Sequence, residues 1–186
     1  MYHVNIQCLN AKRRALCHLL ESFCIEFDVI VRTEIWSYNI DFYTKILPIY
    51  NFYYVLPQMG TVGGVGMYVK NSYCHNIIGE YNLPNSNGYK VEDLWKIIKN
   101  NKKYFIGGIY RHLNQNILDF STTLSKISHQ KLPCIITGDF NIDLLQWKTQ
   151  QSIHDYLDTI TTQSFMPLLI LPTRITSNSS MLIDHM

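Results

Sequence analysis

The segment IITGDFNID, residues 135–143, carries the side chains best suited to chemistry in this chain of 186 residues. An apolar run ends there in Asp139 and Asn141. Alternation along a strand would turn these two side chains to one side and Phe140 into the packing. A carboxylate that deprotonates water, beside an amide that donates to a phosphate oxygen, suits hydrolysis of a phosphodiester. A simple turn is the alternative interpretation, because Gly, Asp and Asn are also the usual turn residues.

Polar side chains also stand at the ends of three other expected strands. Asn5 follows a run near the N-terminus, Glu34 ends DVIVRTE, and Tyr110 follows FIGGI. Each also has a structural explanation: backbone hydrogen bonding for Asn5, a solvated strand end for Glu34, and a core ring for Tyr110. Their recurrence favours one site, since ligands bind at strand ends in layered α/β proteins, and carboxylates there suit Mg²⁺.

The first third of the chain predicts a crossover unit. Residues 3–8 alternate polar and apolar as a strand does, and Asn10 stands where a helix cap belongs. A helix over residues 11–27 is expected to face a core with one apolar stripe, made of Leu16, Leu19, Leu20, Phe23, Cys24 and Phe27. Residues 28–34 form a mostly buried strand.

The rest of the chain is richer in short strands. Residues 63–73, 74–83, 91–100 and 101–111 indicate a run of adjacent, largely antiparallel strands. A helix over 116–127, a strand over 133–139 and a helix around 152–163 follow. No repeat or linker marks a boundary, so residues 1–186 are expected to form one domain. The mixture indicates an α/β sandwich of two sheets with helices outside.

Composition narrows the class of protein. The chain is 47% hydrophobic and 16% charged, which excludes a disordered protein, and its net charge of +2 leans only weakly toward polyanions. Five cysteines without a CxxC pair suggest neither a zinc site nor a disulfide framework, and fit a reducing compartment. Without a secretion signal or an apolar run of membrane-span length, we expect an intracellular protein, nuclear or cytoplasmic, with no membrane partner.

Seven motifs in order carry a resemblance that covers Asn5 to Asp184. They are HVNIQCLN, RTEIW, GGVGMYVKN, GGIYRHLNQN, GDFNIDLL, LPTRIT and LIDH. Together they resemble the endonuclease domain of LINE-type (non-LTR) retrotransposons, within the endonuclease/exonuclease/phosphatase superfamily. The resemblance implies a DNase I-like, four-layer α/β sandwich, with two mixed sheets face to face, helices outside and the last strands missing after Met186. The domain 1–186 is thus expected to be incomplete at its C-terminus.

The resemblance also assigns the metal and the attacking water. It implies that Glu34 binds Mg²⁺, or Mn²⁺ in its place, and that Asn5 helps to place metal, water and phosphate. Asp139 would orient and deprotonate the water, with Asn141 beside it.

Four further residues match the family's pattern. Tyr110 would contact the scissile phosphate, and Asn114 would support the Tyr110 loop. Thr173 of LPTRIT would contact a phosphate. Asp184 matches the aspartate that orients the catalytic histidine in the family.

That histidine is absent from the sequence. In the family it belongs to a Ser-Asp-His motif further along the chain, and no such tripeptide occurs here. His185 cannot replace it if residues 181–186 form a strand, because adjacent side chains point to opposite faces. We expect His185 to be a packing or solvent-facing residue, and we assign no role to His112.

Three functions remain open. The first is a Mg²⁺-dependent phosphodiesterase that nicks double-stranded DNA to prime reverse transcription, with a reverse transcriptase domain in the full-length element. The second is an inactive remnant of a retrotransposon that keeps at most DNA-binding or structural capacity. The third, which LPTRIT and LIDH disfavour, is a lipid or inositol phosphatase.

Overall fold

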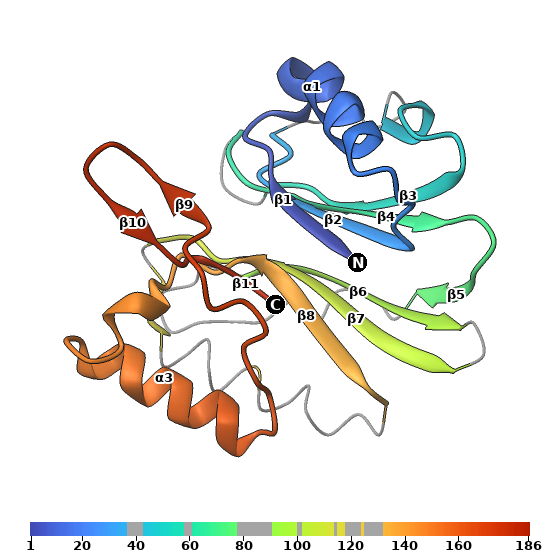
Figure 1. The fold of residues 1–186 in the computed structure, drawn as a ribbon. Coiled ribbons are helices and arrows are strands. Elements are labelled where there is room, and N and C mark those ends of the chain that lie inside the picture. Colours follow the sequence, from blue (N-terminus) through green and yellow to red (C-terminus); the bar gives the residue numbers. More distant parts are fainter. Residues whose placement is uncertain are drawn as a thin grey trace.

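A computed structural model describes residues 1–36, 43–57, 61–77, 91–99, 102–113, 115–117, 124 and 132–186. One mixed sheet has the order β1-β2-β4-β3, with strands β1 (Tyr2–Asn5), β2 (Val29–Thr33), β3 (Tyr50–Val55) and β4 (Val65–Lys70). The second has the order β11-β8-β7-β6-β5, with strands β5 (Cys74–Ile77), β6 (Glu92–Lys99), β7 (Lys103–Tyr110), β8 (Cys134–Asp139) and β11 (Asp184–His185). A hairpin of β9 (Arg174–Ile175) and β10 (Ser180–Met181) projects from the body (Figure 1).

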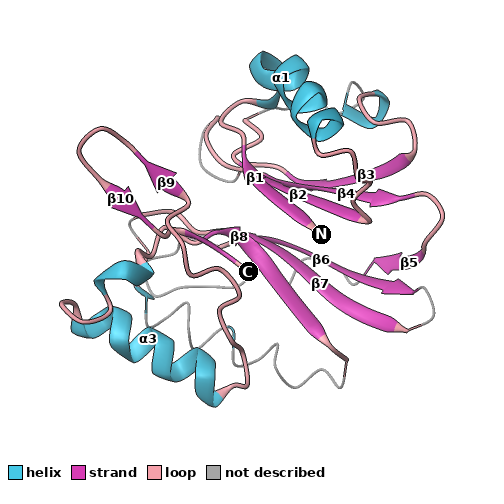
Figure 2. Ribbon diagram, in the orientation of Figure 1, coloured by secondary structure: helices cyan, strands magenta, loops and turns pink. Residues whose placement is uncertain are grey.

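The sheets pack face to face, and a helix covers the outer face of each (Figures 1 and 2). Side chains from both sheets share the central core, including Val31 and Met67 from the first and Leu94 and Ile106 from the second. Helix α1 (Leu9–Ser22) packs on the first sheet, and helix α3 (Gln151–Thr162) packs on the second. Short 3-10 turns, η1 (Tyr43–Lys45) and η2 (Leu144–Gln146), complete the described elements. The predicted four-layer sandwich with mixed sheets is confirmed.

The start of the chain differs from its prediction. β1 ends at Asn5, because Gln7 and Cys8 have positive φ angles of 43° and 74° that turn the backbone out of the sheet. α1 therefore begins at Leu9, with Cys8 in the N-cap position and no side-chain cap. The prediction of Asn10 as the cap is wrong, since Asn10 lies inside the first turn.

The end of α1 also differs. The helix stops at Ser22, although apolar residues continue at helical spacing. Phe23 and Phe27 instead contact the ring of Tyr2, with centroids 5.2 and 5.0 Å away. Apolar residues that pack on an aromatic side chain of β1 therefore recur along the sequence at the same intervals as apolar residues of a longer helix would. Leu16 is buried, but Leu19 is 38% exposed, so the stripe is narrower than predicted.

The predicted run of adjacent strands is divided between the sheets. β4 pairs antiparallel with β2 and β3 in the first sheet, whereas β5, β6 and β7 form antiparallel neighbours in the second. The sequence pattern did not single out β3. The helix predicted over 116–127 lies mostly outside the described residues. The strand and helix predicted over 133–139 and 152–163 are confirmed as β8 and α3.

Candidate active site

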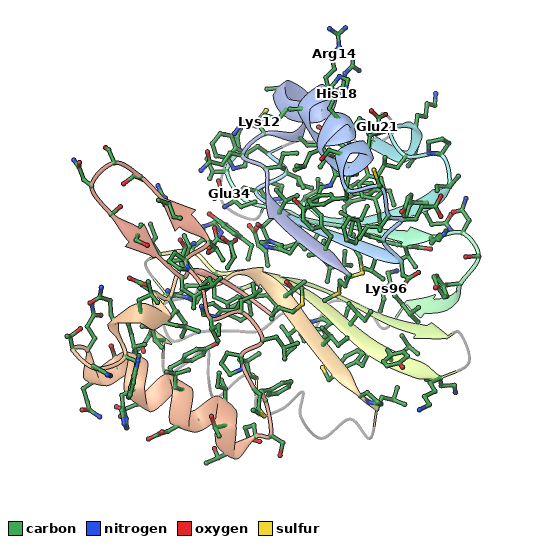
Figure 3. The ribbon with its side chains drawn as sticks, in the orientation of Figure 1. Lys12, Arg14, His18, Glu21, Glu34 and Lys96 are labelled. Carbon is green, nitrogen blue, oxygen red and sulfur yellow. The ribbon has the colours of Figure 1, made fainter. Side chains whose placement is uncertain are left out.

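Four of the predicted site residues meet at one end of the sandwich, because the strands that carry them are paired in parallel within each sheet. β1 pairs in parallel with β2, so Asn5 and Glu34 emerge at the same edge of the first sheet. β7 pairs in parallel with β8, and Tyr110 lies opposite Asp139 in register. Figure 3 labels Glu34 at this end. The crossover topology therefore brings together residues that are far apart in sequence.

The amide of Asn5 joins the two sheets. Its Nδ2 donates to Oε1 of Glu34 at 2.7 Å and to Oδ2 of Asp139 at 2.6 Å. Glu34 is 8% exposed and Asp139 is 2% exposed, so little water screens the two carboxylates from each other. One neutral side chain thus holds two buried carboxylates at a common point.

Glu34 adopts an unusual backbone conformation at this point. Its φ angle of 57° lies in the left-handed region, which costs a residue other than glycine about 1–3 kcal/mol. Backbone hydrogen bonds hold the segment, with the N–H of Cys8 donating to the carbonyl of Glu34 at 3.0 Å. Such strain concentrates at functional sites. The conformation turns the carboxylate of Glu34 toward Asn5.

Asp139 is prepared to exchange a proton near neutral pH. Burial, and after it the nearby carboxylate of Asp184, raise its pKa to about 7. Hydrogen bonds from the backbone N–H of Asn141, at 3.0 Å, and from the side chain of Asn5 oppose this increase. A general base works best when its pKa lies near the working pH.

Asn141 is not placed by strand alternation, so that part of the prediction is wrong. β8 ends at Asp139, and Asn141 has a φ angle of 50°. Its side chain donates to the carbonyl of Arg111 at 2.7 Å, while its backbone N–H orients Asp139. Phe140 is buried in the core on the α3 side, as predicted.

Arg111 holds the loop after β8, a role that our sequence analysis missed. Its buried guanidinium donates to the carbonyls of Phe140 and Gln115 and, at 2.6 Å, to that of Asn141. Three carbonyls, two of them buried and that of Asn141 partly buried, are thereby satisfied by one cation. The signal in the sequence was a charged residue directly after the apolar strand FIGGIY.

Tyr110 is buried at the same edge. Burial raises the pKa of its hydroxyl, and the carboxylates of Glu34, Asp139 and Glu92 raise it further, so the phenol keeps its proton. The ring of His112 contacts Tyr110 edge-on, with centroids 4.7 Å apart, and its Nε2 lies 3.2 Å from Oε1 of Glu92. His112 therefore supports Tyr110, which our sequence analysis did not anticipate.

The last two predicted positions within the described chain also lie at this edge. Asp184 pairs with Asp139 in the β11 and β8 register, and burial raises its pKa. The hydroxyl of Thr173 accepts from the backbone N–H of Asp184 at 3.1 Å and also bonds to its carboxylate, which lowers that pKa. Thr173 therefore fixes the start of β11. Asn114 lies outside the described residues.

The cluster fits a hard divalent cation. Oδ1 of Asn5 is buried and has no hydrogen-bond partner among the described residues, directly beside the carboxylates of Glu34 and Asp139. Across the described part of the chain, no three His, Cys, Asp or Glu side chains gather as a full metal cage. Mg²⁺ keeps several waters and needs only one or two carboxylates from the protein. These donors suit Mg²⁺ better than a metal that requires nitrogen or sulfur.

His185 packs in the core on the α3 side, so of the two predicted environments, packing or solvent-facing, the structure shows packing. It is 6% exposed, stacks on Phe140 with centroids 4.6 Å apart, and places Nε2 2.9 Å from the carbonyl of Ile142. Burial lowers its pKa to about 4. His185 is therefore neutral at physiological pH and faces away from Asp184.

This buried imidazole predicts a loss of stability in acid. Between pH 6.5 and 4 the unfolded chain binds the proton that folded His185 excludes, so the free energy of unfolding falls as the pH falls. His185→Phe should reduce this decrease by about 3 kcal/mol, as measured by urea unfolding at several pH values. His18→Phe, at a side chain 81% exposed, is the control. An unchanged pH slope in His185→Phe would refute the prediction.

The sandwich and its oxygen-rich cluster define a protein of the DNase I-like class. The chain belongs to the endonuclease/exonuclease/phosphatase family, whose model matches residues 3–186. Proteins of this family are typically metal-dependent. The predicted superfamily is thus confirmed. No helix in the described ranges is long and apolar enough to cross a membrane.

Solved structures share this fold at low sequence identity. The endonuclease domain of TRAS1, a telomere-specific non-LTR retrotransposon, matches with a TM-score of 0.70 and 12% identity, covering 98% of this chain and 81% of that one. The mannosyl-6-phosphatase Bt3783 of Bacteroides thetaiotaomicron matches at 0.68 and 14%, covering 99% and 82%. The 3′ phosphatase NExo from Neisseria, bound to a product DNA hairpin, matches at 0.57 and 13%, covering 87% and 69%. No curated protein sequence matches the chain.

Proposed function

We propose that this chain carries a Mg²⁺-dependent phosphodiesterase site that nicks double-stranded DNA, as in LINE-type retrotransposons, where the nick primes reverse transcription. The observation that carries the proposal is the amide of Asn5, which brings Glu34 and Asp139 together and leaves its own oxygen unsatisfied. The likeness to the TRAS1 endonuclease domain and the motifs LPTRIT and LIDH support the retrotransposon branch. The proposed setting is an intracellular element with a reverse transcriptase domain.

Each residue has a task that its environment supports. Glu34 and Oδ1 of Asn5 would hold Mg²⁺, which when bound supplies positive charge that stabilises a phosphate oxygen. Asp139 takes the proton of the attacking water, and the backbone of Asn141 keeps its carboxylate oriented. Tyr110 remains protonated and donates from its hydroxyl to the phosphate.

Thr173 and Asn114 complete the proposed site. Thr173 keeps the start of β11 against the site through the backbone of Asp184 and is proposed to contact a phosphate. Asn114 keeps its proposed task of supporting the loop that follows Tyr110. Neither residue takes part in proton transfer in this proposal.

Plasmid nicking tests the proposal. The purified chain should convert supercoiled plasmid to the open circular form with Mg²⁺ and not with EDTA, and Asp139→Ala should abolish the conversion. Arg14→Gln is the control, because Arg14 projects into solvent from α1 (Figure 3). Folding of each variant is checked by circular dichroism. A folded wild-type chain that does not nick would refute the proposed activity.

An inactive chain that keeps the fold is the alternative. One observation favours it. The histidine that follows Asp184 directly, His185, is buried on the α3 side and therefore does not face the proposed site. Such a chain would still bind Mg²⁺ without nicking DNA. Metal binding is therefore measured separately.

Mg²⁺ should stabilise the folded chain through Glu34. At a concentration tenfold above its Kd the gain is about 1.4 kcal/mol, which raises the melting temperature. Glu34→Gln keeps the acceptor for Asn5 but removes the charge, so most of the gain should disappear. Glu21→Gln is the matched control, at a side chain 73% exposed on α1 (Figure 3). Equal stabilisation of both variants would contradict a metal site at Glu34.

A further inference from the structure

A second polar pair lies beside the Asn5 cluster. His3 precedes Asn5 by two residues on β1, so both side chains lie on the same face of the strand. Nδ1 of His3 lies 3.5 Å from Oδ1 of Asp184, and its Nε2 lies 3.1 Å from the hydroxyl of Thr33. The side chain of His3 is only 5% exposed. The pair therefore connects β1 of one sheet to β11 of the other.

We propose that His3 is a positioning residue that holds Asp184 toward the site by donating from Nδ1 to its carboxylate, while its Nε2 accepts from the hydroxyl of Thr33. This inference rests on the proposed function of Asp139, because Asp184 acts on that residue. It gives His3 a role that the motif comparison did not assign.

The hydrogen-bonding capacities of the neighbours fix the direction of each bond. Oδ1 of Asp184 is buried, accepts no other hydrogen bond from the described residues, and faces Nδ1 of His3 at 3.5 Å. An ionised carboxylate accepts only, so the nitrogen that faces it must carry the proton. The hydroxyl of Thr33 can donate, so it supplies the hydrogen bond that the unprotonated Nε2 of His3 accepts. A neutral imidazole protonated at Nδ1 satisfies both contacts at once.

Two charged groups act on Asp184 beside its contact with His3. Glu34 raises the pKa of Asp184, and Arg174, which lines the adjoining cavity, lowers it. Neither of them bonds to Oδ1, so that oxygen is left to His3.

Asp184 transmits this positioning to Asp139. The two carboxylates are partners in the β11 and β8 register, and the charge of Asp184 raises the pKa of Asp139. Thr173 holds the backbone of Asp184, and His3 holds one carboxylate oxygen. Loss of His3 would leave that carboxylate free to turn into the adjoining cavity of about 560 Å³. The rate should then fall while the Mg²⁺ ligands stay in place.

Nitrogen NMR of the uniformly labelled chain tests the tautomer without reference to activity. The His3 ring, assigned by its loss in His3→Asn, should be protonated at Nδ1, whereas a free neutral imidazole favours Nε2. Protonation at Nε2 would overturn the proposal. This outcome is independent of nicking, so an inactive wild-type chain would refute the proposed function and leave the tautomer to decide the role of His3.

Kinetics of nicking test the consequence. His3→Leu should nick roughly 10- to 100-fold more slowly, as losses of supporting hydrogen bonds commonly do. His3→Asn places an amide nitrogen near the position of Nδ1 and should recover most of the rate. Both variants should retain stabilisation by Mg²⁺. Equal rates in the Leu and Asn variants would contradict the donor role.

Dependence on Asp184 separates positioning from a general loss of stability. In an Asp184→Asn background, His3→Leu should cause no further decrease in rate, because the residue on which it acts has lost its charge. Additive losses would overturn the proposal. If His3→Leu fails to fold, the tautomer and the comparison of His3→Asn with the wild type still decide it.

Discussion

Asp139→Asn is expected to lower the rate of plasmid nicking by roughly 10²- to 10⁴-fold with the fold intact, the usual effect of losing a general base. Asp139 is the buried carboxylate at which the two sheets meet, and burial brings its pKa to about 7. The Asn side chain keeps an oxygen for the backbone N–H of Asn141, but its amide nitrogen replaces the Oδ2 that accepts from Asn5, and it accepts no proton from water. Single-turnover nicking with saturating Mg²⁺ measures the effect. A rate close to that of the wild type would eliminate Asp139 as the base.

The same substitution should change how stability depends on pH. Without metal, the folded chain binds the Asp139 proton more tightly than the unfolded chain, since the folded pKa lies above the ordinary value of 3.8. The contribution of this proton to the free energy of unfolding is fully present below pH 3.8 and is lost as the pH rises through about 7. Asp139→Asn should remove this loss, which amounts to about 4 kcal/mol between pH 4 and 8.

The matched control for stability is Asp155→Asn. Asp155 lies on α3 with its side chain 45% exposed, so its substitution should leave the pH dependence unchanged. Buried His3 and His185 make the free energy of unfolding depend on pH in the opposite direction. The wild type and both variants share this dependence, so it cancels when each variant is compared with the wild type. If Asp139→Asn and Asp155→Asn behave alike in metal-free urea unfolding, the raised pKa of the buried carboxylate at residue 139 is wrong.

The parts predicted well from sequence are those governed by short-range periodicity. The apolar run of β8 ends at Asp139, and the buried run of β2 ends just before Glu34. Parallel pairing then places such strand ends at a common edge whatever the details of the loops. The fold and its two central carboxylates therefore follow from strand patterns and connection lengths. The same logic placed Tyr110 at the end of β7.

The parts missed depend on contacts between distant segments. The guanidinium of Arg111 satisfies carbonyls after β8, and the ring of His3 reaches Asp184, although neither partner is near in sequence. Asn141 leaves the strand conformation because the loop turns at a positive φ angle, which no apolar periodicity encodes. Aromatic contacts of Phe23 with Tyr2 imitate a helical repeat. Periodicity reports which face is buried but not what buries it.

Gly138→Ala is expected to destabilise the chain by about 3 kcal/mol or more, because it overpacks backbone against backbone. A Cβ atom at Gly138 would lie 1.8 Å from the carbonyl oxygen of Ile109, its register partner on β7. No rotation of a side chain relieves that overlap, so β7 and β8 would have to separate next to Tyr110 and Asp139. Close strand approach thus explains the glycine of the GDFN motif better than a turn does. Urea unfolding and Mg²⁺-dependent nicking should both show the loss.

Gly108→Ala on β7 provides the contrast, since its added Cβ would meet a side chain instead. The nearest atom is Cγ1 of Val31 at 2.8 Å, which Val31→Ala removes. In a double-mutant cycle, Val31→Ala should recover about 0.5–3 kcal/mol of the cost of Gly108→Ala. Ile109→Ala should recover none of the cost of Gly138→Ala, because the obstructing oxygen belongs to the backbone. Recovery in both cycles would show that side-chain crowding, and not the approach of the two strands, requires glycine before Asp139.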